Sequence, residues 1–445
     1  MLRYISKLLV PSYLFKDKLT VEPAGKFLAI SWILIILLLP FHGFLSVWLS
    51  SIFGSYLAWR SWKEALVILM LIAGTWWLAR HDKALFAKLA RRRVNQLIAA
   101  YVLLHLLLSA VSGINLEAIL YAIVYNLRFL GIFLAAQILG HYYKRSTSSV
   151  RTLNKLVLIP AGIVISFALL QATVLPNDFL AHFGYGPETI EPYVTIDAKD
   201  EWIRAQSTLR GPNQLGQYLI LPLILMSTLW LAKPAGKLAG GILAGGLAMA
   251  ASYSRSAWLG LAAALGAFLS ADKSWRKWKR QIIAGLAVLA VIIAGLAVSF
   301  AGSDSFKLIV FHDDQAVGDV ADSNTIRVNA TRRSLDAIAA NPLGHGPGYA
   351  GPASFHNDLD TKINENYYLQ IALEVGVAGL LVFLSLNWLV ATSLWRQRQE
   401  LWPRVLFASF IGLFLINFFL PAWANDEIGL MWWGLAGLFY KDYKS

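Results

Sequence analysis

The chain lacks cysteine entirely and is poor in charged residues. None of its 445 residues is a cysteine, which excludes disulfides, thiolate metal sites and thiol-based catalysis. Charged residues account for 15% of the chain and hydrophobic residues for 57%, whereas about a quarter of the residues of a soluble protein are charged. The sequence also lacks a glycine-rich phosphate-binding loop for nucleotides. These deficits argue against a soluble domain and against ATP-driven transport.

Apolar residues instead fill the chain in long blocks. A helix needs about 20 apolar residues to cross a bilayer, and the blocks approach or reach that length. They lie near residues 27–48, 62–79, 96–112, 117–140, 154–175, 214–232, 237–251, 256–271, 281–301, 366–393, 404–421 and 428–440. We therefore predict an all-α polytopic membrane protein with about 12 transmembrane helices, built as a single transmembrane domain over residues 1–445. None of the blocks looks broken at its centre, as the helices of many transporters are.

Positive charge marks the connections between the blocks. The net charge is +13, and every even-numbered connection is basic, which is typical of cytoplasmic loops. We therefore expect both termini in the cytoplasm and two large extracytoplasmic loops, residues 176–213 and 302–365. The first connection is the exception, because it carries Arg60 and Lys63 on the outer side. There is no basic stripe interleaved with aromatic residues, so no nucleic acid partner is expected.

Two arginines lie at predicted outer ends of spans. Arg210 precedes the rigid turn Gly211-Pro212, and Arg255 lies in the tight turn between spans seven and eight. Arginine is selected against in short outer connections, and its guanidinium group offers a planar set of donors that suits phosphate oxygens. Two such groups at one membrane depth would suit a diphosphate. The alternatives are an interfacial anchor for Arg210 and a contact with lipid phosphate for Arg255.

Candidate acids and bases lie in the second outer loop and at its end. Glu365 is predicted where water meets the membrane, at the mouth of span ten, where a general base could act. The alternative is a helix-start carboxylate that the helix dipole favours. His345 and His356 are further candidates, although a loop histidine is more often merely solvated. Residues 324–340 of this loop are predicted to form a helix that ends before Pro342.

One arginine is predicted near the middle of the bilayer. Arg128 lies about eleven residues into span four, where an unpaired charge costs several kcal/mol. The best partner is Glu374 in span ten, so we predict an ion pair between Arg128 and Glu374 that is either structural or lines a polar cavity. The acidic clusters of the second outer loop match no known calcium loop. We therefore predict no metal site and no cofactor.

Taken in order, four segments resemble the O-antigen ligase and O-antigen polymerase family of bacterial membrane glycosyltransferases. They are 210–216, 254–260, 341–348 and 366–369 followed by 374–379, and the resemblance covers roughly residues 120–440. It implies a multi-pass protein of the bacterial inner (cytoplasmic) membrane whose active site faces the periplasm or cell exterior. It also implies a glycan donor linked to undecaprenyl diphosphate and an acceptor hydroxyl on another glycan or on lipid A core.

The resemblance also implies roles for individual residues. Such proteins are taken to hold the diphosphate with outer arginines, here Arg210 and Arg255, and a histidine commonly precedes the Asn-x-Tyr-Leu motif, where this chain has Glu365. The base therefore stays open between Glu365, His345 and His356. The further residues expected to bind diphosphate or substrate are Arg204, Asn213, Asn366 and Tyr368.

The expected reaction is attack of an acceptor hydroxyl on the anomeric carbon while the lipid diphosphate leaves. Fixed arginines would neutralise the charge that grows on the leaving group, so the transfer is expected to be inverting and independent of metal, with a polymerase slightly favoured over a ligase. Two other classes stay open. A transporter or channel for a small anion is suggested by the buried charges, and a non-catalytic scaffold of a glycan-export assembly is the third.

Overall fold

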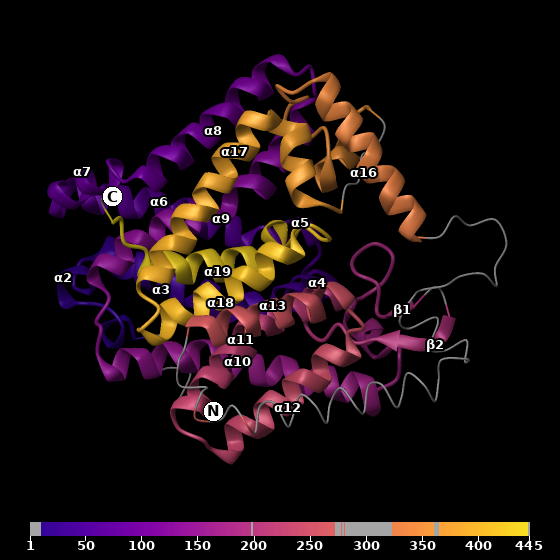
Figure 1. Cartoon of the computed structure of the whole chain (residues 1–445), viewed down its shortest axis with the longest axis horizontal. Helices are drawn as coiled ribbons and strands as arrows, with labels where there is room; N and C mark the ends of the chain where they lie inside the picture. Colours follow the sequence, from indigo (N-terminus) through magenta and orange to yellow (C-terminus); the bar gives the residue numbers. More distant parts are fainter. Residues whose placement is uncertain are drawn as a thin grey trace.

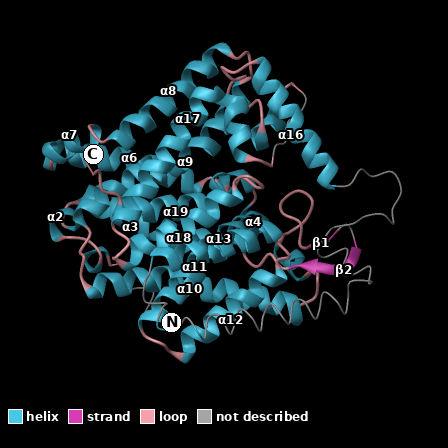
Figure 2. Ribbon diagram, in the orientation of Figure 1, coloured by secondary structure: helices cyan, strands magenta, loops and turns pink. Residues whose placement is uncertain are grey.

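The computed structural model describes residues 10–196, 199–271, 277, 280, 323–359 and 365–443. The predicted span 281–301 and the parts 302–322 and 360–364 of the predicted loop 302–365 lie outside the described residues. In the described part the chain is overwhelmingly helical and contains one small two-stranded sheet (Figure 2). The predicted helical class is therefore confirmed.

The helices follow the apolar blocks of the sequence. The α-helices are α2 (Asp17–Thr20), α3 (Pro23–Leu38), α4 (His42–Phe53), α5 (Tyr56–Arg60), α6 (Trp62–His81), α7 (Lys83–Ala90), α8 (Arg93–Val111), α9 (Leu116–Tyr142), α10 (Thr147–Thr173), α11 (Pro212–Ala232), α12 (Gly236–Ala251), α13 (Arg255–Ala271), α16 (Ser323–Ala340), α17 (Tyr367–Arg396), α18 (Leu401–Ile416) and α19 (Asp426–Phe439). The 3-10 helices are η1 (Pro11–Tyr13), η2 (Leu39–Phe41), η3 (Phe179–Phe183), η5 (Gly351–His356) and η6 (Ala422–Ala424). Strands β1 (Val194–Ile196) and β2 (Lys199–Arg204) pair antiparallel. The helix predicted at 324–340 is confirmed as α16.

Seven described helical segments are long and apolar enough to cross a membrane. They are 23–53 (α3 to α4), α6, α8, α9, α10, α11 and α17, and three shorter apolar helices, α12, α13 and α18, accompany them. Local signals set several of these boundaries. Asn115 caps α9 by accepting a hydrogen bond from the Ala118 amide, and Pro212 occupies the first turn of α11, where its missing amide hydrogen costs nothing. The count of twelve crossings stays a prediction.

The connections between helices gather at two opposite ends of the bundle (Figure 1). We call one the tail end, where residues 11–20, 82–92, 143–146, 397–400 and 440–443 meet; for example, the Lys16 amide donates to the Tyr142 carbonyl at 2.8 Å. We call the other the loop end, where residues 54–61, 112–115, 174–211, 252–254, 341–359 and 417–425 meet. These five segments of the tail end are all among those predicted to be cytoplasmic, and the predicted sidedness stays a prediction.

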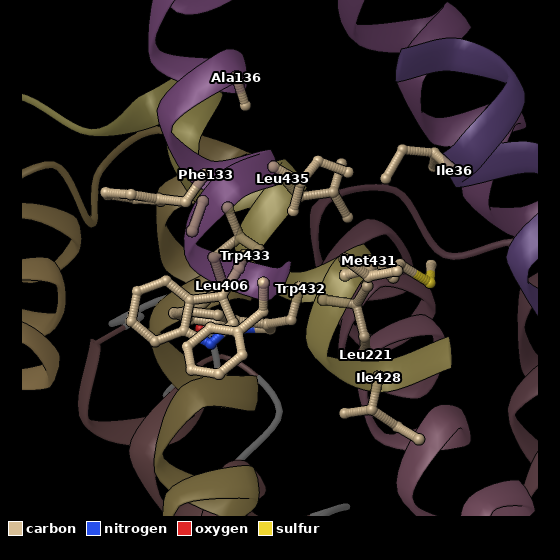
Figure 3. Packing of buried hydrophobic residues seen from close by; sticks show 14 of the residues in the cluster. Ile36, Phe133, Ala136, Leu221, Leu406, Ile428, Met431, Trp432, Trp433 and Leu435 are labelled. Carbon is tan, nitrogen blue, oxygen red and sulfur yellow. The ribbon is translucent and has the colours of Figure 1, made fainter. Parts of the chain in front are cut away.

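Helix α19 forms the centre of the core. Its 14 residues are all buried, and it packs between α9, α11, α3 and α18. Figure 3 shows Trp432 and Trp433 among side chains of neighbouring helices, including Phe133 and Leu406. The indole N–H of Trp432 donates to Ser409 Oγ at 3.1 Å, so that this large apolar side chain is buried without an unpaired donor. A helix that is apolar all round needs such a position.

Helix α17 is broken, contrary to the expectation that no span is interrupted. Val375 and Gly376 leave the helical region, and Gly376 has φ 70°. The loop 341–350 enters the break: the His345 amide donates to Leu373 O at 2.8 Å, and the Val377 amide donates to Pro342 O at 2.9 Å. The loop therefore replaces the helical hydrogen bonds that the break removes, which is how irregular backbone is tolerated at membrane depth.

Candidate functional site

A polar cavity opens at the loop end, and its walls come from segments far apart in the sequence. Its volume is about 480 Å³. It is lined by Tyr125, Thr189, Ile190, Glu191, Val194, Gln206, Arg210, Gln214, Pro352, Pro421, Ala424 and Asn425. Both segments that the sequence marked as large outer loops, 176–213 and 302–365, contribute to this lining. A larger hollow of about 1310 Å³ lies between α8, α13, α17 and α18, but it is mostly apolar and contains none of the predicted site residues.

Arg210 is the cation that lines the cavity. Its side chain packs against Gly43 of α4, where an added Cβ would meet Arg210 Cγ at 3.1 Å. In the described part of the chain the guanidinium makes no hydrogen bond and no ion pair, and its Nε is buried. Burial lowers the pKa of Arg210, but the nearby carboxylates of Asp426 and Glu427 help to outweigh that effect and the pKa is raised. The side chain is thus a permanent positive charge that is available to an anion.

Two other predicted binding residues, Arg204 and Asn213, lie together next to Arg210. Arg204 Nη2 donates to Asn213 Oδ1 at 2.8 Å, and Arg204 Nε donates to the Ser252 carbonyl at 3.0 Å. These bonds tie the segment before α11 to the turn between α12 and α13.

The predicted Arg255 belongs to the same turn, because it is the first residue of α13. Gly216 of α11 fits closely against this turn, since an added Cβ would lie 2.5 Å from Ala257 Cβ and 3.1 Å from Ser254 Cβ. The structure therefore brings the motifs of Arg210 and Arg255 side by side. Arg255 itself is not among the residues that line the cavity.

The motif at the start of α17 helps to hold that helix in place. Asn366 caps α17 by accepting hydrogen bonds from the amides of Tyr368 and Leu369 at 3.0 and 3.1 Å. The Tyr368 hydroxyl donates to the Phe414 carbonyl of α18 at 2.7 Å. Glu365 is half-buried beside this cap. None of Glu365, Asn366 and Tyr368 lines the cavity.

The two predicted histidines lie in different surroundings. His345 belongs to the loop that enters the break of α17, and its ring stacks on Tyr349 with 4.0 Å between ring centroids. His356 ends η5, stacks on Tyr121 of α9 at 3.8 Å, and has Nδ1 3.0 Å from Glu117 Oε1. A carboxylate beside one ring nitrogen orients a histidine and leaves the other nitrogen as an acceptor. His356 therefore has the surroundings of a general base.

His356 is also close to the cavity. Pro352, in the same 3-10 helix, lines it, and four residues of a 3-10 helix span about 8 Å. Tyr121, on which His356 stacks, is one helical turn before the cavity residue Tyr125, a rise of about 6 Å along α9.

The predicted ion pair between Arg128 and Glu374 is wrong. Arg128 pairs with Glu64 at 2.8 Å and with Asp426, whereas Glu374 accepts hydrogen bonds from Asn126 Nδ2 at 2.7 Å and from the Gly348 amide at 2.8 Å. The reason is helix geometry. Asn126 and Arg128 are two residues apart, about 200° around α9, so they face opposite sides. Glu374 holds the loop that enters α17.

A buried charge cluster, which was not predicted from the sequence, adjoins the cavity. Asp426 is the centre of this cluster. It contacts Arg128, Lys63 Nζ at 3.1 Å and His42 Nε2 at 3.2 Å. Arg128 also donates to the carbonyl of Ala424, which lines the cavity. The sequence contained one signal for this cluster. The first connection is basic although it was predicted to lie on the outer side, where basic residues are disfavoured.

Glu427 follows Asp426 and is 1% exposed. Its carboxylate oxygens accept no hydrogen bond from the described residues. The chain thus places both cations and carboxylates, all buried, next to one cavity. Among the residues that the structure describes, no group of three or more His, Cys, Asp or Glu side chains could hold a metal ion.

Comparisons with known proteins point to one family. Residues 240–384 match the model of a family described as O-antigen ligase. That segment contains Arg255, the loop 341–350 and the break of α17. The chain is also similar to an O-antigen polymerase of Salmonella muenchen, at 27% identity over 112 residues. This match covers 23% of the chain and 27% of the relative, so it spans about a quarter of the relative's length.

Proposed function

We propose that this chain is a membrane glycosyltransferase of the O-antigen ligase and O-antigen polymerase type, and the match of residues 240–384 to the family model and the similarity to an O-antigen polymerase support this proposal. It moves or polymerises a glycan from an undecaprenyl-diphosphate-linked donor onto an acceptor hydroxyl at the loop end, which faces the periplasm or cell exterior. The observation that carries this proposal is Arg210. Its guanidinium lines a polar cavity and has no hydrogen bond or ion pair within the described residues.

The diphosphate of the donor binds at Arg210, with Arg255 in the adjoining turn as a second cation. When the bond between the anomeric carbon and the diphosphate breaks, negative charge grows on the leaving oxygen. A fixed guanidinium stabilises that charge more in the transition state than in the bound donor, and this difference accelerates the reaction. A single displacement of this kind inverts the anomeric configuration and needs no metal ion.

His356 takes the proton of the acceptor hydroxyl. None of the three candidates lines the cavity, but His356 has the best support, because Glu117 lies beside its Nδ1 and Pro352 of the same 3-10 helix is a lining residue. Its Nε2 is then the acceptor. His345 packs against α17, and Glu365 lies beside the cap of α17. With this assignment, His356→Gln lowers kcat strongly, whereas His345→Gln and Glu365→Gln leave kcat much less changed.

The proposed activity is tested with purified full-length protein in nanodiscs. A lipid-diphosphate-linked glycan and an acceptor glycan are supplied in the presence of a metal chelator, and products are separated by mass. Elongated or transferred glycan supports the proposal. A lack of product with several donor and acceptor glycans, from protein that still binds undecaprenyl diphosphate, contradicts it. The matched family is described as O-antigen ligase and the relative is named as a polymerase, so the product of this assay, an elongated or a transferred glycan, distinguishes polymerisation from ligation.

The break in α17 also supports a second candidate, a transporter for a small anion. Broken helices and buried ionisable residues are common in transporters, and this chain has both. However, the loop 341–350 fills the break and pairs its backbone groups. Uptake of an anion by proteoliposomes without any glycan product would favour this candidate.

A further inference from the structure

The cations around the cavity fall into two groups. Lys63 and Arg128 are buried, and each lies within 3.1 Å of a carboxylate oxygen of Asp426 or Glu64. Arg210 and Arg60 form no ion pair within 4.0 Å among the described residues, although the carboxylates of Asp426 and Glu427 lie near Arg210. The first two charges are therefore paired directly within the fold, and the last two are not. A guanidinium without a direct carboxylate partner is available to an anionic ligand.

Arg60 is not itself a lining residue of the cavity, but it contacts the lining residue Tyr125. It is the last residue of α5 and is half-buried, and its Nη2 donates to the Tyr125 hydroxyl at 2.5 Å. Tyr125 lines the cavity together with Arg210. A neutral phenol is a weaker partner for a guanidinium than a carboxylate, so this bond positions Arg60 without cancelling its charge.

Tyr125 is itself held in place from the opposite side. The Arg128 guanidinium lies 4.9 Å from the centre of its ring, a distance at which a cation is attracted to the ring face. Because Arg128 is fixed by Glu64 and Asp426, the phenol ring has a rigid support. The hydroxyl that receives Arg60 is therefore held at the cavity wall rather than on a mobile side chain.

The position of Arg60 in the chain supports the same view. It lies in a connection that was predicted to be extracytoplasmic, where basic residues are disfavoured. Its companion there, Lys63, is explained by its contacts with Glu64 and Asp426. Arg60 has no such structural partner within the described ranges.

We propose that Arg60, held by Tyr125 at the cavity wall, is a further binding cation for the diphosphate in addition to Arg210 and Arg255. This inference rests on the proposed function, because it names a further residue that binds the diphosphate of the same donor. It also assigns a purpose to an arginine that lies outside the segment matched by the family model. A diphosphate presents two separate sets of oxygens, so two guanidinium groups bind it more tightly than a monophosphate.

The test measures binding rather than turnover. Purified full-length protein in nanodiscs is titrated with undecaprenyl diphosphate and with undecaprenyl monophosphate. In Arg60→Gln we expect diphosphate binding to weaken about tenfold or more, the loss typical of one charge-assisted contact, and monophosphate binding to weaken much less. Arg60→Lys keeps the charge and should recover part of the loss. Tyr125→Phe, which removes only the hydroxyl, should weaken diphosphate binding in the same direction.

Arg145→Gln is the matched control, because Arg145 lies at the tail end in an exposed pair with Glu400 and should change neither affinity. Equal loss of both lipids in Arg60→Gln, or no loss of either, would overturn the inference. If diphosphate binding depends on Arg60 but no glycan is ever transferred, the binding site stands and the proposed function fails. If glycan transfer occurs and Arg60→Gln has unchanged affinity for undecaprenyl diphosphate, the proposed function stands and the role of Arg60 fails.

Discussion

The two ends of the bundle use charged side chains in opposite ways. At the tail end, Arg145 and Glu400 pair at 2.8 Å, yet their side chains are 40% and 45% exposed. At the loop end, Arg128 and Asp426 pair with side chains that are 6% and 0% exposed. Exposed pairs contribute at most about 1 kcal/mol, whereas a buried charge that loses its partner is costly. The charged pair at the tail end is thus exposed and interacts weakly, whereas the charged pair at the loop end is buried next to the cavity.

The largest expected effect comes from the centre of the buried cluster. Asp426→Ala leaves Arg128 and Lys63 buried with less compensation, and we expect it to destabilise the protein by about 3–5 kcal/mol. Thermal unfolding in detergent measures this. The control is Asp17→Ala at the tail end, where the partner Lys144 lies 3.4 Å away and Asp17 is 76% exposed. Equal stability of the two variants would contradict the contrast between the ends.

Arg210→Ala separates function from stability. We expect glycan transfer to fall by about 10²–10³, the loss typical of removing one fixed donor to a developing anion, while the unfolding temperature changes little. Transfer rates with a lipid-diphosphate donor provide the measurement, and Arg145→Ala should retain full activity. Unchanged transfer in Arg210→Ala would remove the cavity from the mechanism.

A smaller effect is expected at the break of α17. Gly376 has φ 70°, and an added Cβ would lie 2.5 Å from the carbonyl of Leu343. Gly376→Ala should therefore destabilise the protein by about 1–3 kcal/mol. Gly162 in α10 has open space around its Cα, so Gly162→Ala should be neutral or slightly stabilising, because alanine favours helix. If the two variants have the same free energy of unfolding, the loop 341–350 does not constrain the break in α17.

The smallest effect concerns pH at the tail end. Hydrogen bonds from Tyr142 and from the Leu85 amide lower the pKa of Asp82 to about 2. A lowered pKa in the folded state stabilises the protein above the unfolded pKa of about 4, and this contribution is lost as the pH falls toward 2. Wild type should thus lose stability relative to Asp82→Asn between pH 5 and 2. A constant difference over that range would contradict this prediction.

The sequence was sufficient to locate the helices but not to pair the charges. Long apolar blocks placed α6, α9 and α17 within a few residues, because helices that span a bilayer need that length. The break at Gly376 gave no signal, since a glycine within an apolar run does not reveal the loop that will pack against it. Spacing within one helix shows which residues share a face, but which helix lies opposite is decided by tertiary packing. Arg128 was therefore assigned to Glu374 instead of Asp426.

The candidate site also contains residues that were predicted from the sequence and residues that were not. The motifs at Arg210 and Arg255 were predicted from the residues themselves, and the structure places them side by side. Tyr125 and the Asp426 cluster were not predicted, because a tyrosine in an apolar helix is commonplace and an acidic residue is expected at the start of a helix. Three neighbours of these residues did stand out in the sequence, Arg128 as a charge within a span and Arg60 and Lys63 as exceptions to the distribution of basic residues.

The loop within α17 has a consequence for biosynthesis. Its contact with the helix, between His345 and Leu373, joins residues only 28 apart, so closing it requires little chain entropy. The loop is made before α17, and the unit can close once Val377 has left the ribosome, before α18 and α19 emerge. The last two helices therefore meet a partner that is already bent, and a ribosome-bound chain ending near residue 420 should already protect the amides of residues 345 and 377 from exchange.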